Sequence, residues 1–182
     1  MALSCSVRIL GCVLDSNMTF KEHIVNIAKS CFFKLRNMYN VRRCITTDAA
    51  KVMLHTVIIS KLDYCNAILY GLPLTSHSYL QSVQNTAARV ITQTRKYDHI
   101  KYVLKDLHWL PIRSRIENKI LSMIDKSLYG CTRVYLSELL CKRPDRGTRA
   151  DGKNNLLVPK VAGPTLWNAI PNSLKKSSRR AF

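Results

Sequence analysis

Apolar residues recur every three or four positions through the middle of this chain, which is the spacing of one face of an α-helix. Two such patterns occupy residues 60–95 and meet at a turn formed by Gly71, Leu72 and Pro73. Their apolar positions are Leu62, Cys65, Ala67, Ile68 and Leu69 in the first pattern, and Leu80, Val83, Ala87, Val90 and Ile91 in the second. The spacing predicts a helical hairpin against which other helices pack.

Further helices are predicted on both sides of this hairpin. Thr19 and Glu22 have the spacing of a capping box, so a helix is expected to begin there and to run to about Met38. A second helix is expected from Thr46 or Thr47 toward Lys61, and the pattern allows a bent continuation into residues 62–70. A short helix is then expected to begin at Thr94 or Asp98 and to run through Leu107, with a break at 108–111. A long helix should follow, stop at Gly130 and turn Ile116, Ile120, Met123, Ile124 and Leu128 inward, and a short helix is expected over 134–141.

The N-terminal region has a different pattern. Residues 7–14 form a short aliphatic run that contains Gly11 and ends at the turn-forming residues Asp15, Ser16 and Asn17, which predicts a strand. A single strand leaves its backbone groups unpaired, and the chain offers few partner strands. We therefore expect its partner to lie upstream of this sequence.

The composition changes at Lys142. Residues 142–155 are polar and contain Gly and Arg without periodicity, which predicts a linker, and one helical turn around Trp167 and a basic tail are expected after it. The predicted fold is mainly α: a helical bundle with one or two short N-terminal strands and a loosely ordered C-terminal tail. The predicted segments are 1–18, 19–141 and 142–182.

The charge of the chain favours a polyanionic partner. There are 29 Lys and Arg against 11 Asp and Glu, a net charge of +18, which favours nucleic acid or an anionic surface over a neutral partner. The apolar runs are too short to span a membrane, and the N-terminus lacks the basic region of a signal peptide, so we expect no membrane and no targeting segment. The seven Cys include no Cys-x-x-Cys pair, which favours reduced thiols over a zinc site.

The usual signatures of catalysis are missing from the sequence. We find no Gly-rich phosphate loop, no Gly-x-Ser-x-Gly motif and no His-Glu-x-x-His motif. The acidic residues are isolated, whereas a two-metal site needs clustered carboxylates. His55, His99 and His108 lie in or beside apolar stretches, so structural or surface roles are expected for them. We therefore expect no enzyme activity, no cofactor and no metal.

Six blocks, in order, carry a resemblance to a known family. They read LGCVLDSNMTFKEHI, LRNMYNVRRCIT, SKLDYCNAILYGLP, LQSVQNTAARVIT, LHWLPIRSRIENKIL and GPTLWNAIPNSLK. Together they resemble the carboxy-terminal part of reverse transcriptases of LINE-type, non-LTR retrotransposons, including the jockey-like group. The resemblance implies that residues 7–14 correspond to the end of the polymerase palm and the following helices to the thumb and the segment after it. It also implies that the catalytic aspartates lie upstream, outside this chain.

The resemblance and the charge together predict a fragment that binds template–primer, as RNA or RNA–DNA hybrid, through its backbone and without catalysis. The expected setting is intracellular, in the nucleus or cytoplasm, with no small-molecule substrate and with an upstream polymerase domain as a further partner. Tyr64, Tyr97 and Tyr102 could stack on bases, but core packing is the expected role. Two alternatives stay open, a basic helical protein-interaction module and a non-functional product of a decayed element. The candidate phosphate contacts are Arg36, Arg42, Arg43, Lys61, Arg89, Arg95 and Lys96.

Overall fold

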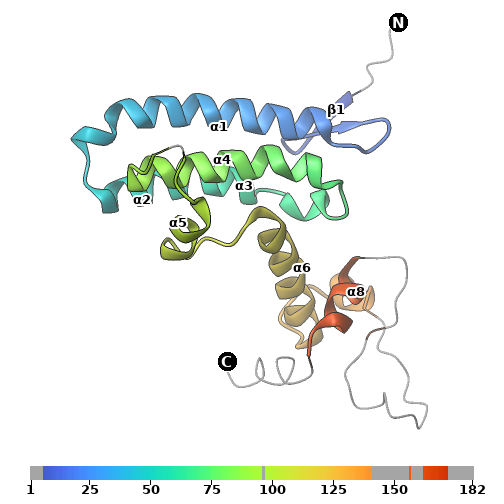
Figure 1. The fold of residues 1–182 in the computed structure, drawn as a ribbon. Helices are drawn as coiled ribbons and strands as arrows, with labels where there is room; N and C mark the ends of the chain where they lie inside the picture. The colour runs from blue at the N-terminus through green and yellow to red at the C-terminus, as the bar shows by residue number, and fades with distance from the viewer. Residues whose placement is uncertain (1–5, 96, 141–155, 157–161, 172–182) are drawn as a thin grey trace, which may run out of the picture. The chain divides into compact units, whose positions relative to one another are not determined.

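The computed structural model describes residues 6–95, 97–140, 156 and 162–171, and they form a mainly helical protein with one small sheet (Figure 1). The predicted fold class is therefore confirmed. The chain divides into two compact units, Met1–Ile116 and Glu117–Phe182, which are described separately below. This division by packing differs from the predicted boundaries at residues 18 and 141, which stay a prediction.

The N-terminal run folds back on itself as an antiparallel hairpin. Strand β1 (Ser6–Ile9) pairs with β2 (Cys12–Asp15), with Ile9 opposite Cys12. Leu10 and Gly11 connect them with φ of 47° and 83°, and positive φ at both central residues is what a tight two-residue hairpin turn requires. The run that was predicted as one strand is therefore two strands, which pair with each other.

Helix α1 (Lys21–Val41) begins differently from the prediction. The Asp15 carboxylate accepts hydrogen bonds from the Thr19 hydroxyl (2.6 Å), the Thr19 N–H (3.0 Å) and the Phe20 N–H (2.7 Å). Thr19 is thus a donor to Asp15, and no side chain caps the helix at Phe20, so the predicted capping box is wrong. The hydroxyl bond from Thr19 and the two N–H bonds lower the pKa of Asp15 to about 2.

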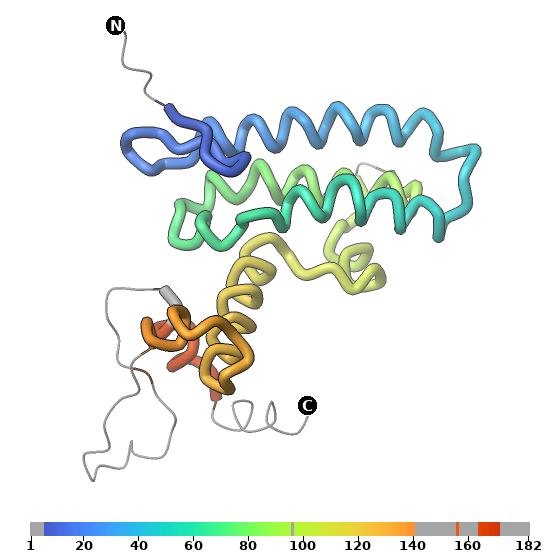
Figure 2. The backbone as a smooth tube through the Cα atoms, turned by 180° about the vertical axis from the view of Figure 1, so that it is seen from behind, coloured from blue at the N-terminus to red at the C-terminus, as the bar shows by residue number. Residues whose placement is uncertain are grey.

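The core of the first unit lies where α1 packs along α4 (Leu74–Thr92), as Figures 1 and 2 show. Helix α2 (Thr47–Leu54) packs on α4, and the segment that follows α2 packs on α1. The predicted second pattern is confirmed, since all five of its apolar residues are buried on α4. Burial of these faces against one another supplies most of the stability of such amphipathic helices. The buried apolar residues of α1 and of the segment that follows it are Ile24, Ile27, Ala28, Cys31, Leu35, Met38, Ala50, Leu54, Ile58, Ile59 and Leu62.

The first arm of the predicted hairpin is a bent helix that breaks. Helix α2, whose first turn is capped by the Thr46 hydroxyl on the Ala49 N–H, passes through a π-helical turn, η2 (His55–Ile59), into α3 (Ser60–Asp63). Cys65 then takes a left-handed φ of 51°, and only a 3-10 turn, η3 (Asn66–Leu69), follows. The predicted regular helix over 62–70 is therefore wrong, because left-handed backbone at Cys65 interrupts the i to i−4 ladder.

Two glutamines of α4 hold the start of α6 (Ile112–Leu128), which follows the short helix α5 (Ile100–Asp106). The side chain of Gln84 is fully buried and donates to the carbonyl of Leu110 (2.8 Å), while the Ile112 N–H donates to Oε1 of Gln81 (3.0 Å). The Gln81 amide also donates to Oε1 of Gln84 (3.0 Å). Side chains thus satisfy backbone groups that the new helix cannot satisfy itself.

The second unit has its own small core. Ile124 packs with Leu156 and with Trp167 of α8 (Ala162–Ala169), and the Asn168 amide bonds both the N–H and the carbonyl of Leu156 at 2.9 Å. The helical turn around Trp167 and the stop at Gly130, with φ of 71°, are confirmed. A short helix, α7 (Val134–Glu138), replaces the longer one expected over 134–141.

Of the inward positions predicted on α6, Ile116 and Ile124 are buried and Ile120 and Leu128 are partly buried. Met123 is 44% exposed, so its predicted inward position is wrong. Of the predicted linker and tail, only residues 156 and 162–171 lie among the described residues.

The Asp15 carboxylate should make stability depend on pH at the acidic end. Because its folded pKa is lowered from 3.8 to about 2, its contribution is complete above about 4 and is lost as the pH falls toward 2. Asp15→Asn is expected to lower the urea midpoint at neutral pH, with the difference from the wild type shrinking over that acidic range. Asp48→Asn, at an exposed carboxylate, is the matched control. Equal midpoints of Asp15→Asn and wild type at neutral pH would contradict this role.

Candidate nucleic-acid interface

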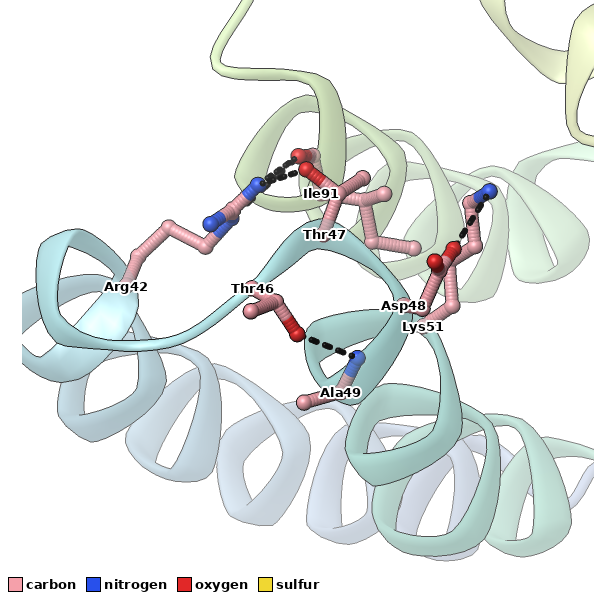
Figure 3. Close-up of polar contacts among 7 residues, drawn as sticks. All are labelled: Arg42, Thr46, Thr47, Asp48, Ala49, Lys51 and Ile91. Atoms are coloured by element: carbon pink, nitrogen blue, oxygen red, sulfur yellow. Dashed lines mark hydrogen bonds and ion pairs between the residues drawn. The ribbon is translucent and has the colours of Figure 1, made fainter.

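Arg42 is a structural residue inside the first unit. It is only 7% exposed, and its guanidinium donates to the carbonyls of Val90 (3.1 Å), Ile91 (2.8 Å) and Ile45 (2.9 Å) and to the Thr47 hydroxyl (3.0 Å). Figure 3 shows Arg42 with Ile91 and Thr47. The Val90 and Ile91 carbonyls belong to the last turn of α4, where backbone acceptors lack intrahelical partners and the helix dipole is negative. The prediction that Arg42 contacts phosphate is therefore corrected, because its donors are already used.

Arg42 also determines where two other candidates lie. It belongs to the 3-10 turn η1 (Arg42–Cys44) and ties that turn to the last turn of α4. Its neighbour Arg43 is exposed there, and Arg95, also exposed, follows the end of α4 by three residues. The fold thus brings Arg43 and Arg95 to the same end of the first unit, although they are far apart in sequence. Lys96 lies outside the described residues.

Arg36 and Arg89 occupy the long helices. Arg36 is exposed on α1, fewer than two helical turns before η1. Arg89 is half-buried on α4, and its Nε is buried with no hydrogen-bond acceptor among the described residues. Arg36 is therefore available to a ligand near the end that carries Arg43, whereas Arg89 is only partly available.

Lys61 lies in a separate place, in a cleft beside the hairpin. The cleft has a volume of about 280 Å³, and Arg8 lines it together with Lys61. The Lys61 ammonium donates to the Ser30 hydroxyl (2.6 Å). The other lining residues are Gly11, Val13, His23, Asn26 and Ile27, so none of the seven is acidic.

Two details of this cleft bear on its charge. The buried His23 ring accepts the Val13 N–H at Nδ1 (3.3 Å), and burial lowers the pKa of His23, which favours the neutral ring. The charge of the cleft therefore comes from Arg8 and Lys61. Sequence reasoning missed Arg8, because only the hairpin, which was read as one strand, carries it beside Lys61.

Four exposed arginines of the first unit form no ion pair with a described residue. Among the described residues, no carboxylate pairs with the side chain of Arg8, Arg36, Arg43 or Arg95. Examples of ion pairs in the described residues are Lys51 with Asp48 (3.3 Å) and Arg115 with Asp63 (2.7 Å). A phosphate that approached Arg43 and Arg95 would break no ion pair, although the Asp98 carboxylate, which accepts the Arg95 N–H (2.9 Å), adds a negative charge beside Arg95.

The three tyrosines considered as base contacts lie on the surface. Tyr97 is 91% exposed, Tyr102 is 71% exposed and Tyr64 is 54% exposed, so the expectation of core packing was wrong for all three. The Tyr64 hydroxyl donates to the Leu10 carbonyl (2.7 Å) and holds the hairpin turn. Tyr97 and Tyr102 have no such bond among the described residues.

Other classes of site find no support in the part of the chain that the structure describes. Within it, no three His, Cys, Asp or Glu side chains come together in a way that could hold a metal ion. No helix described there is both long enough and apolar enough to cross a bilayer. Comparisons with family models, with curated proteins and with solved structures gave no match to this chain.

The role of Arg42 can be tested by stability. Arg42→Ala leaves the Val90 and Ile91 carbonyls without their donors in a buried place, so the free energy of unfolding should fall by about 3 kcal/mol. Arg42→Lys should recover only part of this loss, since an ammonium cannot reproduce the planar fork. Arg43→Ala, at the exposed neighbour, is the matched control and should change stability by less than about 0.5 kcal/mol. Equal effects of Arg42→Ala and Arg43→Ala in urea unfolding would refute the assignment.

Proposed function

We propose that this chain is the thumb-like part of a reverse transcriptase of the LINE-type, non-LTR class, and that it binds the backbone of template–primer, as RNA or RNA–DNA hybrid, without reading its sequence. The observation that carries the proposal is the group of exposed arginines, Arg36, Arg43 and Arg95, on and beside the helices of the first unit, with no carboxylate partner among the described residues. The second cationic place is the cleft of Arg8 and Lys61.

Backbone binding suits this arrangement for two physical reasons. Arg side chains bind phosphate through a planar, bidentate fork, and each contact releases counterions, which gives affinity without sequence preference. A heteroduplex of RNA and DNA is recognised mainly by its shape and its phosphates, since its deep major groove is closed to side chains. Arginines held at a defined end by the buried Arg42 are better placed for such a ligand than arginines on a loose segment.

The order of elements also supports the proposal. The resemblance implies a strand region followed by thumb helices, and the chain has a hairpin followed by α1 to α6. The net charge of +18 favours a polyanion over a neutral partner. The proposal assigns binding to this chain and leaves nucleotide addition to the polymerase centre that the resemblance places upstream.

The binding surface can be tested with a labelled RNA–DNA duplex. The double variant Arg43→Gln with Arg95→Gln should weaken binding and make the slope of log K against log salt shallower by about 2, which is about 1 per lost phosphate contact. The matched control removes two exposed cations of the second unit, by Lys126→Gln with Arg133→Gln, and should change the slope less. Identical slopes for the two double variants would refute the proposed surface.

The protein-interaction alternative predicts instead a partner complex that survives nuclease and equal salt slopes for the two double variants, because any chain of net charge +18 binds a duplex in a salt-dependent way.

The absence of a catalytic step can be tested directly. The purified chain, supplied with a primed RNA template, deoxynucleotides and Mg²⁺, should incorporate no nucleotide, because a two-metal centre needs clustered carboxylates. A mixture with an active reverse transcriptase serves as the positive control. Incorporation above the level of a boiled sample would overturn this part of the proposal.

A further inference from the structure

A second cleft of the first unit combines aromatic, cationic and acidic side chains. It has a volume of about 340 Å³, which falls in the range of sites that hold small organic groups. One side comes from α2 and the start of the π-helical turn, and the other from the end of α5 and the loop after it. The lining residues are Lys51, Val52, His55, Asp106, Leu107, His108 and Trp109. None of the phosphate contacts discussed above is among them.

Two backbone irregularities meet at this cleft. His108 has a left-handed φ of 53°, and the bonds from the Trp109 N–H to the Leu104 carbonyl (2.8 Å) and from the His108 N–H to the Lys105 carbonyl (3.0 Å) are those of a Schellman helix end. Glycine is the residue that normally occupies this left-handed position without strain. A histidine there is a less stable choice that places an imidazole at the cleft.

His55, on the opposite side, opens the π-helical turn η2. Single π turns within α-helices are uncommon and occur frequently at functional sites. The left-handed backbone at His108 is strained, and such strain is kept where the surrounding structure or a function requires it. The two features lie in separate elements, and both place a histidine on the lining of the same cleft.

The side chains define the chemistry of a ligand. The indole of Trp109 and the two imidazoles supply flat aromatic surfaces on which a base can stack without regard to sequence. Lys51 supplies a cation, and its pair with Asp48 is exposed on both sides (50% and 91%), so a phosphate can replace the carboxylate at little cost. The Asp106 carboxylate can accept a hydrogen bond from an exocyclic amine.

We infer that this cleft binds one nucleotide unit of a single strand, with the base stacked against Trp109 and the phosphate at Lys51. The inference rests on the proposed function, because it assumes a nucleic-acid ligand, and it adds a base-contacting site to the backbone surface. A base with an exocyclic amine, such as adenine, fits the carboxylate better than one without.

The test uses the full chain and a short fluorescein-labelled oligoadenylate, followed by anisotropy. Trp109→Leu keeps an apolar side chain but removes the ring, and it should weaken binding about tenfold, whereas Trp109→Phe should retain most of the affinity. An abasic strand of equal length should bind the wild type about as weakly as oligoadenylate binds Trp109→Leu. Equal affinity of the wild type for the abasic strand and for oligoadenylate would overturn the inference.

His108→Gly separates binding from folding. Relief of the left-handed backbone should raise the melting temperature by about 2–4 °C, while loss of the imidazole should weaken oligoadenylate binding. A higher melting temperature with unchanged binding would assign His108 to the helix end alone and remove it from the site. Free adenosine 5′-monophosphate distinguishes the source of the ligand: competition shows that a free nucleotide suffices, and its absence shows that the flanking strand is needed.

The duplex assay keeps the two proposals apart. If Trp109→Leu binds the RNA–DNA duplex with the wild-type salt slope but discriminates less between oligoadenylate and the abasic strand, the cleft is a base site beside a working backbone surface. If the duplex is bound through Arg43 and Arg95 and Trp109→Leu changes no affinity, the cleft inference fails alone. If the wild type binds neither probe, both fail.

Discussion

The first unit depends on one contact between a buried guanidinium and the end of a helix. Arg42 brings a permanent positive charge to the carbonyls of Val90 and Ile91, at the negative end of α4. Its guanidinium also donates hydrogen bonds to the Ile45 carbonyl and the Thr47 hydroxyl. The connection between α1 and α2 is thereby joined to the end of α4 through one side chain. The charge of the chain suggests a ligand-binding role for Arg42, but Arg42 instead stabilises the packing of the helices.

This use of Arg42 explains how charge is divided in the molecule. Burial of this arginine is tolerated because its guanidinium is hydrogen-bonded, to two carbonyls in the last turn of α4, to the Ile45 carbonyl and to the Thr47 hydroxyl. Its neighbour Arg43 has no such partner and stays in solvent, as do Arg36 and Arg95. The same region therefore carries a structural cation inside and free cations outside. The proposed phosphate surface follows from the second group only.

The helices could be predicted from the sequence, whereas many of the connections could not. Apolar spacing located α4 and α6, Thr46 marked the start of α2 and Gly130 marked the stop after α6, because these signals act within a few residues. The hairpin, the break at Cys65 and the turn at His108 use positive φ at Leu10, Cys65 and His108, residues that rarely adopt it. The choice of Asp15 over Thr19 as acceptor, and the burial of Arg42, depend on contacts between segments. No local pattern separates Arg42 from Arg43, since only the position of α4 makes them different.

The amides of Gln81 and Gln84 have a consequence for how the sequence of α4 can vary. They can bond the backbone at Leu110 and Ile112 only from one face of the helix. Each inserted or deleted residue would rotate the following part of the helix by about 100° about its axis. Arg42 holds the carbonyls at the C-terminal end of the same helix. Side-chain contacts therefore fix the rotation of α4 about its axis at two positions along its length. An insertion or deletion between these two positions would break either the glutamine bonds or the Arg42 bonds, because the helix could keep only one of the two sets in register. Tolerance to insertion therefore belongs to the segments outside them.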